Sequence, residues 1–118
     1  MMAEAQQPFH VQAAYFDALA NPESGKTKEA RWAGARLITG TKYGDKITLY
    51  CYDKTMDMIV GHKFWYGSIE EMLEVEGYRN LLPMAINFEH AVRLYKELRH
   101  QACGVENGPM IAVALKKV

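Results

Sequence analysis

Two alternating runs joined by a tight turn constrain the fold of this chain most. Residues 47–52 alternate apolar side chains with polar or aromatic ones, and residues 56–66 form a longer run after the turn at residues 53–55. A period of two is the pattern of a strand that buries one face. The runs therefore predict an antiparallel hairpin. On its second strand we expect one face to carry Met58, Val60, His62 and Phe64, and the other Trp65.

The remaining elements each have a local signal. Alternation indicates short strands at residues 9–13, 26–32 and 111–115, and an alanine-rich stretch predicts a helix over residues 14–20. Ser68 followed by Glu71 is a capping box, and it predicts a helix that ends at Gly77. Four or five mostly antiparallel strands with few helices favour a small barrel flanked by helices, an α+β fold.

Asn87 is the predicted cap of a longer helix. Apolar residues recur after it at helical spacing and predict a buried stripe. The stripe consists of Phe88, Ala91, Val92, Tyr95 and Leu98. We expect the other face, with Glu89, Arg93, Lys96 and Arg99, to lie in water.

Length and composition limit the classes of function. The 118 residues predict one domain over residues 9–118 after a flexible N-terminus at residues 1–8. Lysine plus arginine and aspartate plus glutamate both number 14, which argues against bulk electrostatic binding of long duplex DNA but allows a local basic patch. Cys51 and Cys103 lack metal-type spacing and predict free thiols in a reducing compartment, the cytoplasm with the nucleus left open. We expect no membrane segment.

Charge is distributed unevenly along the chain. Residues 26–46 hold six basic side chains against two acidic ones, whereas residues 68–77 hold four glutamates and no basic residue. If the fold joins these segments, a cleft with a cationic wall and a carboxylate wall would suit a nucleotide. The simpler interpretation, which the pattern alone favours, is that both segments are solvated surface.

The stretch Ser24–Arg31 concentrates the candidate chemistry. On a strand, Glu29 and Arg31 share one face and are close enough for an ion pair, while Lys26 comes from the turn at Ser24-Gly25. The pair is either structural or a device that orients Arg31 toward a ligand. Several aromatic residues on or beside the strands offer stacking surfaces, of which we expect one or two to contact a ligand. They are Trp32, Tyr43, Tyr50, Tyr52, Trp65 and Tyr66.

Cofactor signals are absent from the sequence. The four histidines, His10, His62, His90 and His100, have no ligand-type spacing. No glycine-rich phosphate loop or nucleophile elbow occurs. We therefore expect no metal and no cofactor.

The stretch Ser24–Arg31 resembles the hallmark G-x-K-x-x-E-x-R of the ASCH domain family, a branch of the PUA-like β-barrels. Lys26, Glu29 and Arg31 match the hallmark, Ser24 replaces its first glycine, and Gly25 lies beside it. Further pieces follow in the family's order and extend the resemblance over about residues 9–117. They are Gly44-Asp45, Tyr66-Gly67-Ser68, Leu73–Gly77 and Leu82-Pro83.

The resemblance implies a PUA-like mixed barrel of five or six strands with a cleft lined by the motif, and RNA or nucleotide binding. Some family members are amidohydrolases that remove acyl groups from modified cytidine, with a Lys, a Thr and a Glu proposed to act; others are linked to RNA cleavage. The Lys corresponds to Lys26 and the Glu to Glu76, but Glu29 stands in place of the Thr. A covalent route through that position is therefore less plausible than a water activated by Glu29 or Glu76.

Our preferred hypothesis is an RNA- or nucleotide-binding module with a cleft lined by Lys26, Glu29, Arg31 and Glu76. An amidohydrolase of N4-acetylcytidine type, a ribonuclease and a protein-interaction adaptor are the alternatives. The candidate catalytic residues are Lys26, Glu29 and Glu76. The candidate ligand-binding residues are Lys26, Thr27, Glu29, Arg31, Trp32, Trp65 and Tyr66. We expect a monomer whose partner is RNA or a nucleoside or nucleotide.

Overall fold

The computed structural model describes residues 8–118, so the predicted flexible N-terminus falls almost wholly outside the described residues. The strands are β1 (Pro8–His10), β2 (Lys28–Trp32), β3 (Lys46–Cys51), β4 (Lys54–Tyr66) and β5 (Met110–Lys117). The helices are α1 (Ala13–Ala20), α2 (Arg36–Thr39), α3 (Ile69–Glu76), α4 (Tyr78–Leu81) and α5 (Phe88–Cys103), with a 3₁₀ turn at Pro22–Ser24. No helix among the described residues is long and apolar enough to span a membrane.

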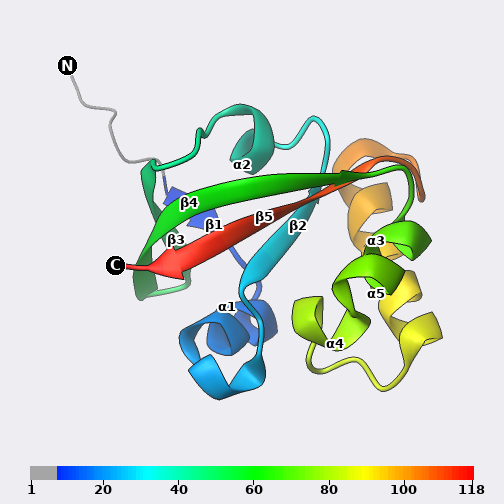
Figure 1. Cartoon of the computed structure of the whole chain (residues 1–118), viewed down its shortest axis with the longest axis horizontal. Helices are drawn as coiled ribbons and strands as arrows, with labels where there is room; N and C mark the ends of the chain where they lie inside the picture. The colour runs from blue at the N-terminus through cyan, green and yellow to red at the C-terminus, as the bar shows by residue number, and fades with distance from the viewer. Residues whose placement is uncertain (1–7) are drawn as a thin grey trace.

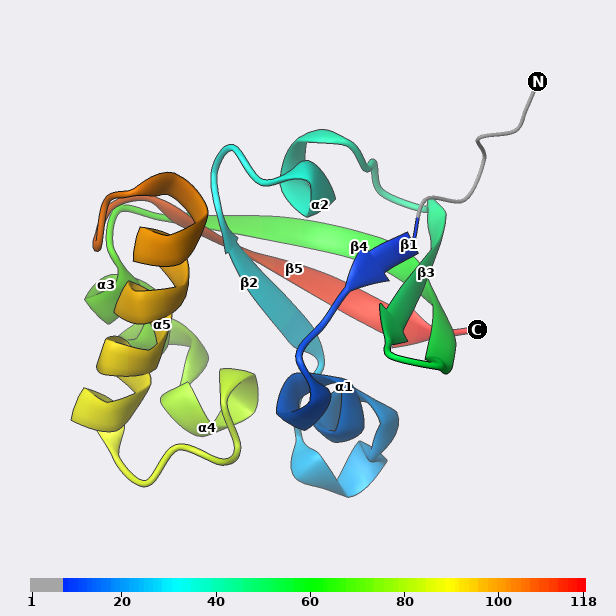
Figure 2. The same cartoon turned by 180° about the vertical axis from the view of Figure 1, so that it is seen from behind.

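The strands form one five-stranded mixed sheet in the order β1-β3-β4-β5-β2. β1 runs parallel to β3, and the other three pairings are antiparallel, including the predicted hairpin of β3 and β4. The sheet curves into a half-barrel with β4 and β5 on one side and β1 on the other (Figures 1 and 2). The predicted α+β class, with a small mixed sheet flanked by helices, is confirmed. The motif strand β2 lies at an edge of the sheet, and this position leaves one side of it to the helices.

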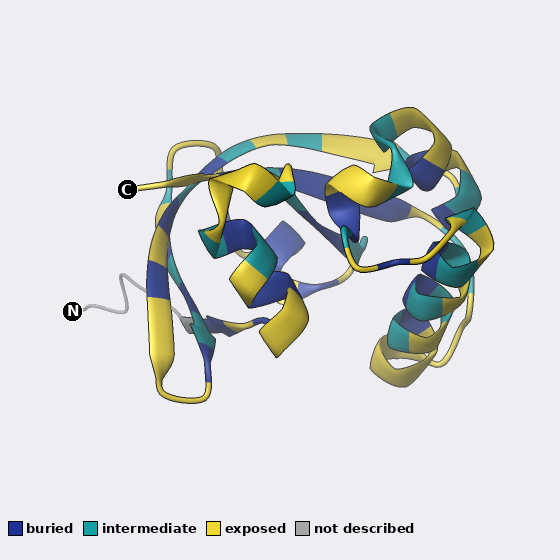
Figure 3. Ribbon diagram, turned by 90° about the horizontal axis from the view of Figure 1, so that it is seen from below, coloured by how far each residue is buried: buried dark blue, intermediate teal, exposed yellow. Residues whose placement is uncertain are grey.

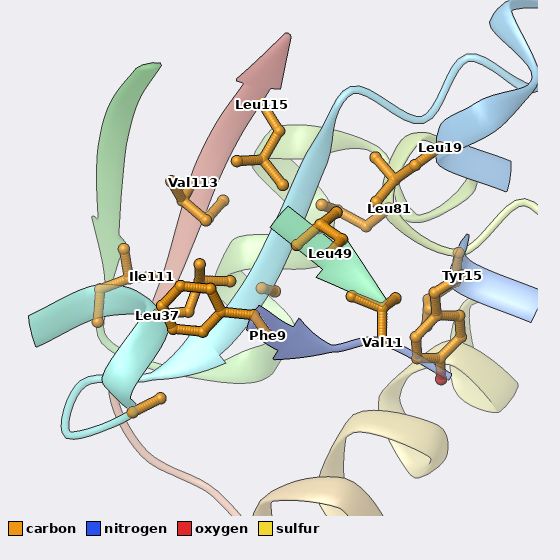
Figure 4. Close-up of a cluster of buried hydrophobic side chains, with 14 of the residues drawn as sticks. Phe9, Val11, Tyr15, Leu19, Leu37, Leu49, Leu81, Ile111, Val113 and Leu115 are labelled. Atoms are coloured by element: carbon orange, nitrogen blue, oxygen red, sulfur yellow. The ribbon is translucent and has the colours of Figure 1, made fainter. Parts of the chain in front are cut away.

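The interior of the half-barrel is filled from both strands and helices. Figure 4 shows side chains of β1, β3 and β5 meeting those of α1, α2 and α4 in one cluster. Leu49, Ile111 and Val113 are fully buried in it. The ring of Tyr15 lies at the edge of this cluster, with its hydroxyl oxygen directed out of it (Figure 4).

A β-bulge corrects the predicted faces of the long strand. Val60 pairs with Leu115 and Lys63 with Val113, so Gly61 and His62 together lie opposite a single residue of β5. The extra residue reverses the alternation beyond it. Lys63 therefore points inward, where its ammonium donates to the carbonyls of Ile38 and Thr41, whereas His62 and Phe64 are exposed. The expectation that they share the buried face of Met58 and Val60 was wrong for this reason.

Helix termini follow the caps that the sequence contains. The Ser68 hydroxyl accepts the amide of Glu71, and the Asn87 side chain accepts the amide of His90. α5 carries buried, intermediate and exposed residues in bands along its length (Figure 3). Arg99 is an exception to its predicted exposure, because only 9% of its surface is accessible. α2 was not predicted, since four residues are too few to show a helical period.

Gly25 directs the chain into the motif strand. Its φ of 81° and ψ of −4° are left-handed, a conformation that costs a residue with a Cβ about 1–2 kcal/mol. We expect Gly25→Ala to lower the free energy of unfolding by about that amount in equilibrium urea denaturation. Gly67→Ala is the matched control, because its Cβ would meet only the flexible end of the Glu71 side chain. Equal stability of the two variants would contradict the account of this turn.

Candidate functional site

Hydrogen bonds hold both sides of the 3₁₀ turn through which the chain enters the motif. The Asn21 side chain caps the 3₁₀ turn by accepting the amide of Glu23. The Ser24 hydroxyl donates to the carbonyl of Ala18 and accepts the amide of Lys26 at 3.1 Å. Lys26 lies ahead of β2, outside the strand alternation that the sequence predicted for it. Its side chain is therefore free to turn into the interior.

Lys26 is a buried structural cation. Its side chain has no accessible surface, and Nζ lies 2.8 Å from Glu29 Oε1, 2.8 Å from the carbonyl oxygen of Lys28 and 2.6 Å from that of Leu81. The two carbonyls accept hydrogen bonds from the ammonium group, and the Glu29 carboxylate forms an ion pair with it. Lys26 thus ties the motif strand to α4, and its buried ammonium is not accessible to a ligand.

Glu29 is shared between two cations. Its side chain is 1% exposed, and its other oxygen, Oε2, lies 2.5 Å from Nη1 of Arg31. Burial alone raises the pKa of a carboxyl group, but the charges and hydrogen bonds of Lys26 and Arg31 outweigh burial here. They hold the pKa of Glu29 below its ordinary 4.5, and the carboxylate is ionised at neutral pH.

Arg31 and Trp32 line a cleft of about 190 Å³ beside the edge strand. The Arg31 side chain is 24% exposed, and Nη1 also donates to the carbonyl of Ala30 at 2.9 Å. Across the cleft lie residues of α1 and α5, among them Tyr15, Tyr95 and Arg99. The cleft therefore combines a fixed guanidinium with aromatic walls.

Two neutral phenols contribute to this cleft. Burial, followed by the negative charge of Glu29, raises the pKa of Tyr15 to about 12. The same two causes raise the pKa of Tyr95 well above 10.0. Within residues 8–118 no hydrogen bond engages either hydroxyl. Both are therefore protonated donors that a ligand in the cleft can use.

Arg99 reaches the cleft from α5 instead of facing water. Its Nη1 donates to the carbonyl of Val105 at 2.9 Å, which fastens the loop after α5. A Cβ on Gly108 would lie 2.5 Å from Nη2 of Arg99, so glycine at position 108 leaves the space for the guanidinium. Helical periodicity could not predict this, because the partner is a loop backbone.

Glu76 belongs to a second cluster. Oε1 of Glu76 lies 2.6 Å from Nζ of Lys28, and Oε2 accepts a short hydrogen bond from the Tyr66 hydroxyl. Burial, then the bond to Glu76, raises the pKa of Tyr66 to about 12. No ion pair within residues 8–118 joins Glu76 to Lys26 or Arg31. The predicted four-residue cleft is therefore divided in two.

Two other residues that the sequence analysis assigned to the site, Thr27 and Trp65, lie away from Arg31. Thr27 is exposed and lines grooves away from Arg31, and Trp65 is 64% exposed at the end of β4. Among the ion pairs of residues 8–118, Glu76 is the member of the acidic segment that meets the basic segment, whereas Glu70 pairs with Lys96. Sequence reasoning missed the cleft roles of Tyr15, Tyr95 and Arg99, of which Tyr95 had appeared only as part of an apolar stripe. No group of three metal-ligating side chains occurs in the described part of the chain.

Comparison with solved structures supports the fold. The hypothetical protein PH0355 aligns with a TM-score of 0.72 at 25% identity, covering 96% of this chain and 99% of its own. Protein PF0455 from Pyrococcus furiosus aligns with a TM-score of 0.66 at 20% identity, covering 95% of this chain and 98% of its own. No family model matches the chain, and no curated protein matches it in sequence.

Removing one member of the buried cluster should destabilise the protein strongly. Breaking a buried pair leaves an uncompensated charge and costs about 3–5 kcal/mol. We expect Lys26→Met and Glu29→Gln each to lower the free energy of unfolding by this amount in urea denaturation. The double variant should lose less than the sum of the two. Additive losses would show that the residues do not interact.

Glu29 should also set part of the acid stability. Its folded pKa lies below the unfolded value, so its contribution is complete above about pH 4.5 and is lost as the pH falls through the folded pKa. The stability gap between wild type and Glu29→Gln should therefore narrow below pH 4.5. Unfolding free energies measured from pH 3 to pH 7 check this. A gap that stays constant over that range would exclude the ionised carboxylate as its source.

Proposed function

We propose that this chain is an ASCH-type module that binds RNA or a nucleotide in the cleft beside β2. One observation carries the proposal. The ionised Glu29 holds the guanidinium of Arg31 at a cleft whose wall includes the half-buried indole of Trp32. A fixed guanidinium suits a phosphate, and an indole face suits a base.

The charge of the cluster favours an anionic ligand. Lys26 and Arg31 carry two positive charges and Glu29 one negative charge, which leaves one positive charge beside the cleft. Arg99 adds a second cation to the lining. A phosphate group would find charge-assisted donors there, and these form stronger hydrogen bonds than neutral pairs.

The size of the cleft suits a small part of a ligand. A volume of about 190 Å³ lies below the roughly 300–1,000 Å³ of most small-molecule sites. One base or sugar fits such a space, and the rest of a nucleotide or strand would extend outside it. The protonated hydroxyls of Tyr15 and Tyr95 can then donate to a base carbonyl or a ribose oxygen.

Within this proposal the motif residues divide into two roles. Arg31 and Trp32 touch the ligand. Lys26 and Glu29 stay buried and act as positioning residues, because all their charged atoms already bind other protein groups. Two free cysteines, one buried and one exposed, fit a protein of the cytoplasm.

Hydrolysis of an acylated nucleoside receives less support from the geometry. A general base works best with a pKa near neutral pH, whereas the pKa of Glu29 is lowered. The Lys26 side chain has no accessible surface on which to meet an oxyanion, and Glu76 is bound by Lys28 and Tyr66. Incubation with N4-acetylcytidine followed by mass spectrometry should leave the substrate intact. Deacetylation that is lost in Glu76→Gln would favour the enzyme instead.

The binding proposal predicts a tryptophan signal. The chain has two tryptophans, so Trp65→Phe leaves Trp32 as the reporter in the cleft. Nucleoside 5′-monophosphates should quench its fluorescence, and inorganic phosphate should compete. Arg31→Gln should weaken the binding by about tenfold or more, since a charge-assisted hydrogen bond contributes about 1.5–3 kcal/mol.

Arg93→Gln is the matched control, because Arg93 is exposed on α5 and lies outside the cleft. Its affinity for nucleoside monophosphates should equal that of the Trp65→Phe protein, in which all these variants are made. Melting temperatures should identify any variant that has lost its fold. No quenching by any of the four monophosphates at millimolar concentration would refute the proposal. Binding that Arg31→Gln leaves unchanged would refute the assigned site.

A further inference from the structure

A second surface lies on the outside of the half-barrel. In Figure 1 the outer side of β4 and β5 faces the viewer, and over the left part of these strands no helix lies in front of them. We call this surface the open face and define it by Tyr43, Lys46, Ile59, His62, Phe64 and Lys116. None of these residues lines the cleft beside β2.

The strand register places these residues on one side of the sheet. Lys46 pairs with Ile59, and Ile59 pairs with Lys116, so the three form a row across β3, β4 and β5. Directly opposed residues share a face of the sheet. Beyond the bulge at Gly61 and His62, Lys63 takes the inward position. Phe64 therefore lies on the outer side of the sheet, as Ile59 does.

Aromatic rings continue from this row along β4. The ring of Tyr43 lies 4.7 Å from that of His62, and His62 lies 6.4 Å from Phe64. Tyr43 is 70% exposed and Phe64 38%, so ring surface is left uncovered. The bulge produces this row, because regular alternation would have turned His62 and Phe64 toward the interior.

Positive charge borders the rings. Lys46 and Lys116 are exposed, and Nζ of Lys28 lies 4.5 Å above the centre of the Phe64 ring. Glu76 pairs with Lys28 and offsets its charge, so Lys46 and Lys116 are the cations that the proposal uses. Asp45 accepts the amide of Lys42, and Asp57 accepts the hydroxyl of Thr48, which are both neutral groups. The open face therefore presents stacking surfaces next to cations.

We propose that the open face binds single-stranded RNA, with bases stacked on Tyr43, His62 and Phe64 and phosphates near Lys46 and Lys116. Aromatic stacking beside a positively charged track is how proteins hold single strands with little sequence preference. This inference takes RNA as the ligand from the proposed function, but it uses different residues.

Fluorescence anisotropy with a labelled twelve-nucleotide oligouridine tests it on the full chain. Stacking contributes about 1–3 kcal/mol per base, so the double variant Tyr43→Ala with Phe64→Ala should bind at least tenfold more weakly. The control is Tyr52→Ala, because Tyr52 is 88% exposed and lies in the turn between β3 and β4. Its affinity should match that of wild type. An oligothymidine of the same length shows whether the face distinguishes RNA from DNA.

Salt dependence tests the charges separately. Each phosphate contact on a single strand contributes about −0.7 to the slope of log K against log salt concentration. Lys46→Gln with Lys116→Gln should make the slope less negative by about 1.4, two such contacts, whereas Lys54→Gln should leave it unchanged. Lys54 is the exposed first residue of β4, where its ammonium lies 3.4 Å from Asp17 and away from the row.

The outcomes separate the two sites. Face variants should bind nucleoside monophosphates at the cleft like wild type, as read from Trp32 fluorescence. If wild type does not bind oligouridine, or if the face variants bind it equally well, the open face is not an RNA surface, and the cleft proposal stands on its own test. If oligouridine binding depends on the face while monophosphates leave Trp32 unquenched, the cleft proposal fails and the open face remains.

Discussion

The buried carboxylate of Glu29 is the interaction on which the site depends. It lies between Lys26 and Arg31, and the Lys26 ammonium in turn donates hydrogen bonds to the backbone carbonyls of Lys28 and Leu81. Three charged groups in the interior are costly to desolvate unless each has its partners, and here they have them. The cluster therefore joins the edge strand to α4 and presents Arg31 at the cleft in a defined orientation. Because desolvating these charges costs free energy of folding, we look for a role of the cluster beyond packing.

The position of β2 at the edge of the sheet explains why a cleft forms there. A central strand would be flanked by two others, whereas β2 has β5 on one side only. Helices α1 and α5 approach the other side, and the aromatic residues Tyr15 and Tyr95 lie between them and the motif. On the outside of the half-barrel a single extra residue in β4 has the opposite effect, since it turns His62 and Phe64 into solvent. One inward and one outward surface thus arise from two local features of the same sheet.

Much of this fold could be predicted from the sequence, because its signals are local. The hairpin, the caps at Ser68 and Asn87 and the closing strand follow from periodicity and side-chain chemistry. The ion pair of Glu29 and Arg31 also follows from their spacing on a strand. The bulge could not be predicted, because it depends on the register between β4 and β5. The burial of Lys26 and Arg99 could not be predicted either, since their partners are backbone carbonyls distant in sequence or in irregular loops. The pairing of Glu76 with Lys28, and not with Lys26 or Arg31, could not be predicted either, because it depends on how α3 lies against β2.

A crystal structure of the protein with a nucleoside 5′-monophosphate would show whether Glu29 holds Arg31 for an anionic ligand. We expect a phosphate oxygen within hydrogen-bond distance of the Arg31 guanidinium, a base or ribose against Trp32, and an unchanged contact between Glu29 and Arg31. A nucleotide bound beside Lys28 and Glu76, with no ligand atom near Arg31, would contradict it.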